Sequence, residues 1–256
     1  MEFLKDTWYL FRRLWRATLR MPVFVIISIV QPILWVLLFG QLFRSVTTIP
    51  GFGSDSYVQF LAPGIAIMTA LFGAAYSGMG LLADIDRGVL DRMLATPVSR
   101  GALIAGRILH SAVLVIFQAG LILIVACLLG ARPRGGIPGL LVVFLAASLL
   151  GAAFASFSNA LALLARRQEL VIAVMNFVVL PTTFLSSMIM SRNLMPGWIR
   201  GVSRFNPVNW AVTAARDGFE GRAAAEMALS LALLAGFALV CGFLATRAFG
   251  RYRRAM

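Results

Sequence analysis

The segment Leu82–Arg107, LADIDRGVLDRMLATPVSRGALIAGR, lies between two long apolar runs and is where acidic and basic residues crowd together. Helical spacing would place Asp84, Arg87 and Asp91 on one face. An apolar stripe lies beside that face and consists of Leu90, Met93, Leu94 and Pro97. Because the residue before a proline is pushed out of the α region, Pro97 should end the helix. The pattern predicts a short amphipathic helix, although composition alone is equally compatible with a charged loop between two membrane helices.

The same segment carries a recognisable motif. Residues 86–100, DRGVLDRMLATPVSR, resemble the acidic-Arg-Gly-x-Leu-acidic-x-Leu-x-x-(Thr/Ser)-Pro-(Val/Leu) signature of ABC-2-type permeases. In those membrane subunits the segment is a cytoplasmic coupling helix that docks on an ATP-hydrolysing partner. The resemblance assigns this docking role to Asp86, Arg87, Gly88, Leu90, Asp91, Met93, Leu94 and Pro97.

The composition is that of an integral membrane protein. Of the 256 residues, 60% are hydrophobic and 13% are charged, whereas in soluble domains about half are apolar and about a quarter charged. The net charge of +13 comes almost wholly from arginine, since Lys5 is the only lysine. These bases cluster at the ends of apolar runs, where they meet lipid headgroups, and we therefore expect membrane lipids and no nucleic acid as partners.

Residues 1–21 are predicted to form an amphipathic helix in the membrane interface. One side carries Leu4, Trp8, Phe11, Trp15 and Leu19, and another carries Lys5, Arg12, Arg16 and Arg20. Such a helix buries its apolar face about 5–10 Å into the headgroup boundary. The alternative is a basic tail ahead of the first membrane helix, but the regular aromatic stripe favours the amphipathic helix. A charged start of this kind does not resemble a cleavable signal peptide.

Residues 22–247 contain six apolar runs, each long enough to cross about 30 Å of hydrocarbon as a helix. They are residues 23–43, 58–83, 104–130, 137–165, 170–190 and 227–246. The second run is expected to tilt or to be interrupted near Pro63-Gly64. Residues 191–226 mix short apolar pieces with prolines and bases, which predicts short re-entrant or outer helices. Residues 248–256 form a basic tail.

The distribution of arginine orients this all-α, six-helix plan. Most of the 23 basic residues fall in segments that lie inside when both termini are cytoplasmic. The arginines of residues 191–226 run against the rule. We therefore expect a multi-pass protein of the bacterial cell membrane with both termini in the cytoplasm.

The plan as a whole also resembles an ABC-2 permease. Residues 205–216, FNPVNWAVTAAR, are similar to the family's second motif, an Asn-Pro followed by an aromatic residue and a later arginine. The matching positions are Asn206, Pro207, Trp210 and Arg216. In style the chain is similar to the short permeases of bacterial drug, glycolipid and polysaccharide exporters, such as the daunorubicin-resistance type. These motifs indicate the class of transporter and not its cargo.

The sequence offers little for catalysis. A phosphate-binding loop needs a lysine deep in the chain, so ATP and Mg²⁺ are expected on a partner subunit and no cofactor on this chain. The single histidine, His110, is expected to pack between helices or lie at the interface. Cys127 and Cys241 both fall inside apolar runs and imply neither a disulfide framework nor a metal site.

Three polar residues within the crossings are candidates for a cargo pathway: Gln31, Asn159 and Asn176. Ionised residues are nearly absent there, which argues against ion-driven transport. The plainer role for these amides is hydrogen bonding between helices. A mostly apolar route suits a lipid-like or aromatic cargo better than a sugar or an ion.

Three functions are compatible with these features. The first is the permease subunit of an ATP-driven exporter of an amphiphilic drug, lipid or glycolipid, working as a homodimer with two ATPase subunits. The second is a non-transporting scaffold that uses the same ATPase contact. The third is a metal-dependent lipid enzyme built on Asp84, Asp86 and Asp91, although the interleaved Arg87 and Arg92 favour charge pairing. The two motifs favour the exporter subunit.

Overall fold

The computed structural model describes residues 2–20, 22–49, 52, 54, 56–94, 100–222 and 224–254. Within these stretches the chain forms helices and no β-strand, which confirms the all-α prediction for this part of the chain. The helices are α1 (Glu2–Leu19), α2 (Pro22–Leu42), η1 (Arg44–Thr48), α3 (Tyr57–Ala75), α4 (Ser77–Asp86), α5 (Val89–Leu94), α6 (Arg100–Leu128), α7 (Gly136–Ala165), α8 (Gln168–Phe184), η2 (Arg192–Leu194), α9 (Gly197–Ser203), α10 (Pro207–Glu220) and α11 (Ala224–Arg254).

Each of the six predicted apolar runs is helical over most of its length. Four stretches are long and apolar enough to cross a membrane: Tyr57–Asp86, Gly101–Leu128, Gly136–Ala165 and Ala224–Ala248. Two shorter apolar helices accompany them, Ile26–Leu42 and Gln168–Phe184. The chain is therefore a multi-pass membrane protein, and the count of six crossings stays a prediction.

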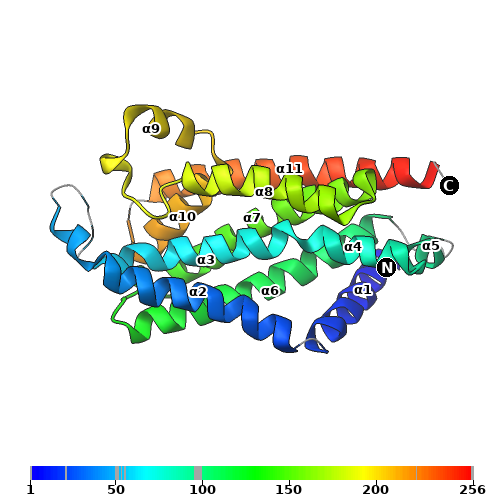
Figure 1. The fold of residues 1–256 in the computed structure, drawn as a ribbon, viewed down its shortest axis with the longest axis horizontal. Coiled ribbons are helices and arrows are strands. Elements are labelled where there is room, and N and C mark those ends of the chain that lie inside the picture. Colours follow the sequence, from blue (N-terminus) through cyan, green and yellow to red (C-terminus); the bar gives the residue numbers. More distant parts are fainter. Residues whose placement is uncertain are drawn as a thin grey trace.

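The long helices run side by side along one axis, and α1 stands at an angle to them (Figure 1). The N-terminus, α5 and the C-terminal end of α11 lie at one end of this bundle, while η1, α9 and α10 lie at the other (Figure 1). Helix α7 contacts α3, α4, α6, α8, α10 and α11. It is rich in alanine and glycine, which lets neighbouring backbones approach closely where lipid gives helices no hydrophobic drive to associate.

The second crossing is interrupted at Tyr76, between α3 and α4, and not near Pro63-Gly64 as the sequence suggested. Pro63 lies inside α3, which continues without a break. At the interruption the backbone N–H of Gly78 donates to the hydroxyl of Ser158 over 3.1 Å. A side chain from α7 thus satisfies a backbone group near the break, which is the condition for breaking a helix inside a membrane.

The fifth apolar run ends as a helix at Phe184, short of the predicted residue 190. The reason is Asn206, the residue before α10. Its Nδ2 donates to the carbonyl oxygens of Thr182 (2.6 Å) and Leu185 (3.1 Å). These bonds satisfy carbonyl groups that another helical turn would have used. The segment that follows contains η2, α9 and α10, in agreement with the short helices predicted before the last crossing. Helix α11 then continues to Arg254, through most of the predicted basic tail.

Candidate coupling site

The sequence predicted one helix from Asp84 to Pro97 in the segment with the first motif. The structure has two helices there. Helix α4 ends at Asp86, and α5 begins at Val89 after a turn at Gly88. Gly88 has φ +64°, a left-handed conformation that favours glycine because it has no Cβ. The break therefore follows from the glycine in the motif.

The turn between α4 and α5 presents charge at the end of the bundle. Asp86, Arg87 and Arg92 are exposed, while Met93 is half-buried. Pro97 lies outside the described residues, as do the side chains of Leu90, Asp91 and Leu94. An exposed acid next to an exposed base, on a fixed turn, is a surface that can orient a charged partner.

Asp84 is the ionic centre behind this turn. Its Oδ1 accepts from Arg13 Nη2 of α1 at 2.6 Å, and its Oδ2 accepts from Arg107 of α6. The side chains of Asp84 and Arg107 are only 13% and 14% exposed, against 38% for Arg13. One carboxylate therefore joins α1, α4 and α6.

Charge pairing of Asp84 is confirmed, but the partners are not the neighbouring Arg87 and Arg92. The sequence contained one signal for this. Arg13 stands outside the helical row of Lys5, Arg12, Arg16 and Arg20, so an inward role was open to it. In the structure, Arg13 Nη1 also donates to the Sδ of Met93 at 3.4 Å, which brings α5 into the same cluster.

Helix α1 has a third face that the two-sided pattern did not reveal. Leu10 is buried against α6, where a Cβ on Gly106 would stand 2.8 Å from the Leu10 Cβ. Thr18 Oγ1 lies 2.8 Å from His110 Nε2, and the Trp15 ring meets the edge of the His110 ring. His110 is thus a helix-packing residue, as the sequence predicted.

The other two faces of α1, one aromatic and one basic, are exposed or only partly covered. Trp8, Phe11 and Trp15 stack in sequence, with ring centroids 5.3 and 6.0 Å apart. The basic row is exposed and consists of Lys5, Arg12, Arg16 and Arg20. The helix therefore combines a docked face, an aromatic face and a basic face.

Two of the three proposed pathway residues come together at the break between α3 and α4. The hydroxyl of Tyr76 donates to Asn176 Oδ1 over 2.6 Å, and Asn159 Nδ2 donates to Ser77 Oγ over 3.3 Å. Gln31 is exposed on α2, a helix that packs against α3 and α6, and it is not part of this cluster. The buried Asn159 Oδ1 has no hydrogen-bond partner within the described chain.

The second motif builds the opposite end of the bundle. Asn206 caps α10 by accepting from the Val208 N–H at 2.9 Å, and Pro207 occupies the first turn, where a missing N–H costs nothing. Trp210 Nε1 donates to the Arg204 carbonyl at 2.7 Å. These residues fix the start of α10.

Arg216 is the buried anchor of the same end. Its guanidinium donates to the carbonyl oxygens of Phe60 (3.3 Å), Ser187 (2.9 Å) and Met188 (3.3 Å). It also lies 3.7 Å from the centre of the Phe60 ring, in cation–π geometry. Burial lowers the pKa of Arg216 to about 10, which leaves the group charged at neutral pH. Arg216 therefore ties α10 to α3 and to the segment after α8.

The geometry defines a class of protein, a multi-pass helical membrane subunit with a charged turn at one end and no ATP-binding motif in its sequence. Residues 5–219 match the ABC-2 type transporter family. The chain belongs to the ABC-2 transporter permeases, and it is a membrane subunit of an ABC transporter, whose ATPase is a partner protein.

Several relatives carry transport names. The daunorubicin resistance ABC transporter permease protein DrrB1 of Streptomyces coeruleorubidus is 28% identical over 240 residues, covering 92% of this chain and 84% of that protein. The putative transport permease ycf38 of Cyanophora paradoxa is 31% identical over 215 residues, covering 84% and 74%. The inner membrane transport permease YadH of Escherichia coli K12 is 27% identical over 260 residues, covering 96% of each chain.

Proposed function

We propose that the chain is the permease subunit of an ATP-driven exporter and that the ATPase docks on the turn between α4 and α5. The observation that carries this proposal is the exposed Asp86-Arg87 pair, held on the left-handed turn at Gly88. The turn projects at an end of the bundle, where a soluble partner can reach it (Figure 1). ATP and Mg²⁺ are then bound by the partner, and this chain supplies the docking surface.

The end of the bundle that carries α5 is the cytoplasmic end in this proposal. Both termini lie there as well (Figure 1). The basic row of α1 belongs to the same end, and an excess of arginine marks the cytoplasmic side of membrane proteins. The relative YadH carries an inner-membrane name, which supports a bacterial cell membrane as the location.

Movement of the ATPase reaches the membrane helices through the ionic centre at Asp84. Arg13 contacts both Asp84 on α4 and Met93 on α5, so a displacement of α5 acts on α1 as well. Arg107 carries the same connection into α6. A rigid-body shift at the docking turn can therefore move three helices together.

Two copies of the chain form the transporter, each with its own ATPase. Six apolar helices are few for a complete pathway, and most soluble oligomers are symmetric assemblies of one chain. The cargo is an amphiphile such as an aromatic drug, lipid or glycolipid. The drug named for DrrB1, daunorubicin, is of this kind, and the crossings of this chain offer amides and hydroxyls and few ionised groups.

The test is reconstitution of the chain with a P-loop ATPase from the same genome. Inverted vesicles are given ATP, and uptake of daunorubicin and of a fluorescent phospholipid is followed. Arg87→Ala should reduce ATPase co-purification at least tenfold and abolish uptake. Arg204→Ala is the matched control, because Arg204 is an exposed arginine at the opposite end.

The outcomes separate the parts of the proposal. Full ATPase binding and uptake by Arg87→Ala would refute docking at the turn. ATP hydrolysis by the complex without uptake of either probe would refute the amphiphilic cargo. It would not contradict docking at the turn.

A further inference from the structure

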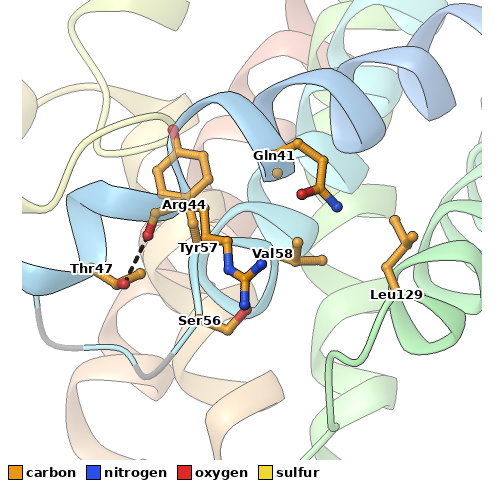
Figure 2. A pocket seen from close by; sticks show the side chains of 8 residues that line it. Gln41, Arg44, Thr47, Ser56, Tyr57, Val58 and Leu129 are labelled. Carbon is orange, nitrogen blue, oxygen red and sulfur yellow. Dashed lines mark hydrogen bonds between the residues drawn. The ribbon is translucent and has the colours of Figure 1, made fainter.

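The outer end of α2 carries a polar cavity of about 370 Å³ that the transport proposal does not use. It is lined by Gly40, Gln41, Arg44, Thr47, Ser56, Tyr57, Val58 and Leu129, from α2, η1, α3 and the end of α6. Figure 2 shows the guanidinium of Arg44 extending toward Ser56 and Val58, with Gln41 and Leu129 across the cavity. The volume falls in the range of small-molecule sites.

The only charged group in this lining is basic. Arg44 makes no side-chain hydrogen bond or ion pair with any residue that the structure describes. The Thr47 hydroxyl is used locally and donates to the Arg44 carbonyl at 2.9 Å. The guanidinium, the Gln41 amide and the Ser56 hydroxyl are side-chain donors in this lining, and a guanidinium favours a phosphate or carboxylate.

An apolar groove of about 830 Å³ adjoins the cavity along α2. Gln41 lines both spaces, and the groove continues over Trp35, Leu37, Leu38, Phe39 and Leu42. Leu38 and Leu42 are 65% and 68% exposed. A row of rings, Trp35, Phe39 and Phe43, leads along α2 toward Tyr57, with successive centroids 4.9, 5.5 and 5.5 Å apart.

We infer that the cavity and groove together bind one outer-leaflet phospholipid with an anionic headgroup, its phosphate on Arg44 and an acyl chain along α2. The two spaces have the complementary chemistry and the order that such a lipid requires, with the polar space nearer the end of the bundle. A glycine shapes the junction, since a Cβ on Gly40 would stand 2.8 Å from the Val58 methyl group. The assignment to the outer leaflet depends on the orientation proposed above, but binding itself does not.

Native mass spectrometry of the purified full-length chain tests the inference. The delipidated protein is titrated with phosphatidylglycerol and, separately, with phosphatidylcholine of the same acyl chains. Arg44→Gln should weaken phosphatidylglycerol binding about tenfold, the loss expected for a hydrogen-bonded charge. Arg204→Gln, an exposed arginine at the same end, should bind as the parent does.

Two results would overturn the site. One is equal phosphatidylglycerol affinity in Arg44→Gln and the parent, and the other is equal affinity of the parent for both lipids. A third arm tests whether a second copy fills the groove instead, using Leu38→Cys. Crosslinking between copies at Leu38→Cys, together with no retained lipid, would refute the lipid occupant. No ATPase is present in these measurements, so their failure is distinct from failure of the transport proposal.

Discussion

Replacing Asp84 by Asn tests whether the ionic centre holds α1 and α6 to the second crossing. The substitution keeps the size of the side chain and removes its charge, which leaves Arg107 without its counter-charge at a side chain only 14% exposed. Breaking a buried pair in this way costs about 3–5 kcal/mol. Because Asp84 is not fully buried, we take the lower figure, about 3 kcal/mol.

Arg13 and Arg107 should differ in how much their pairing with Asp84 contributes to stability. Arg13 is 38% exposed, so water screens its attraction to Asp84 and Arg13→Gln should cost about 1 kcal/mol or less. For a chain of this size, 1 kcal/mol corresponds to roughly 2–4 °C in Tm. Asp84→Asn should therefore lower Tm by about 6–12 °C and Arg13→Gln by no more than about 2–4 °C. Thermal unfolding of the purified chain in detergent, followed by tryptophan fluorescence, measures both shifts.

A matched control stands two residues away. Asp86 is exposed at the end of the same helix, so Asp86→Asn should change stability by less than about 0.5 kcal/mol. Asp84→Asn combined with Arg107→Gln should be less destabilised than the sum of the single changes, because no charge is then left unpaired. Equal Tm values for Asp84→Asn and Asp86→Asn would refute the assignment of Asp84 as the ionic centre.

Three further changes probe other parts of the structure. Gly88→Ala places a Cβ at φ +64° and should cost about 1–2 kcal/mol while lowering ATP-driven uptake, and normal uptake would argue against a role for this turn. Arg216→Gln removes donors from three backbone carbonyls and should reduce the yield of folded protein in detergent, whereas unchanged elution and Tm would contradict the anchor role. Desolvation raises the pKa of Asp217, so the folded chain binds this proton more tightly than the unfolded chain does. Its contribution to stability should decline as pH rises from its ordinary pKa of about 4 through the raised value, and Asp217→Asn should flatten the Tm profile over that interval.

The approximate positions of the apolar helices could be predicted from the sequence because they follow from hydropathy. Helix α7, for example, was expected at residues 137–165 and occupies Gly136–Ala165. The short helices before the last crossing could also be predicted, since each apolar piece was too short to span and too apolar for a free loop.

The errors arise where side chains from distant helices decide a boundary. The break at Tyr76 involves Ser158 on α7, and the end of α8 involves Asn206, 22 residues beyond Phe184. Neither partner is visible in a local pattern, because side-chain hydrogen bonds inside a membrane can replace backbone bonds at any point where two helices meet. An interruption near Pro63-Gly64 was one of two alternatives, the other being tilt, and α3 continues through Pro63 without a break.

At the candidate coupling site, too, the sequence predicted some features and missed others. The motif located the segment, but the sequence predicted one helix through Gly88, and the left-handed conformation of that glycine appears only in the structure. Asp84 lies just before the motif, and its partners Arg13 and Arg107 are separated from it by 71 and 23 residues. Charge pairing was predicted from the interleaved Arg87 and Arg92, but the partners found depend on how α1 and α6 pack against α4.

The third face of α1 bears on how force reaches the membrane. An amphipathic helix that only floated in the headgroup layer could slide, and motion of α5 would then be lost to lipid. Here Leu10 packs on Gly106 and Thr18 lies against His110, so α1 is fixed to α6 at two levels, and between them Arg13 binds Asp84 of α4. A helix fixed in this way should move with the crossings that it touches. If the ATPase docks on the turn as proposed, the contact between Arg13 and Met93 places α1 on the path from that turn to the membrane helices.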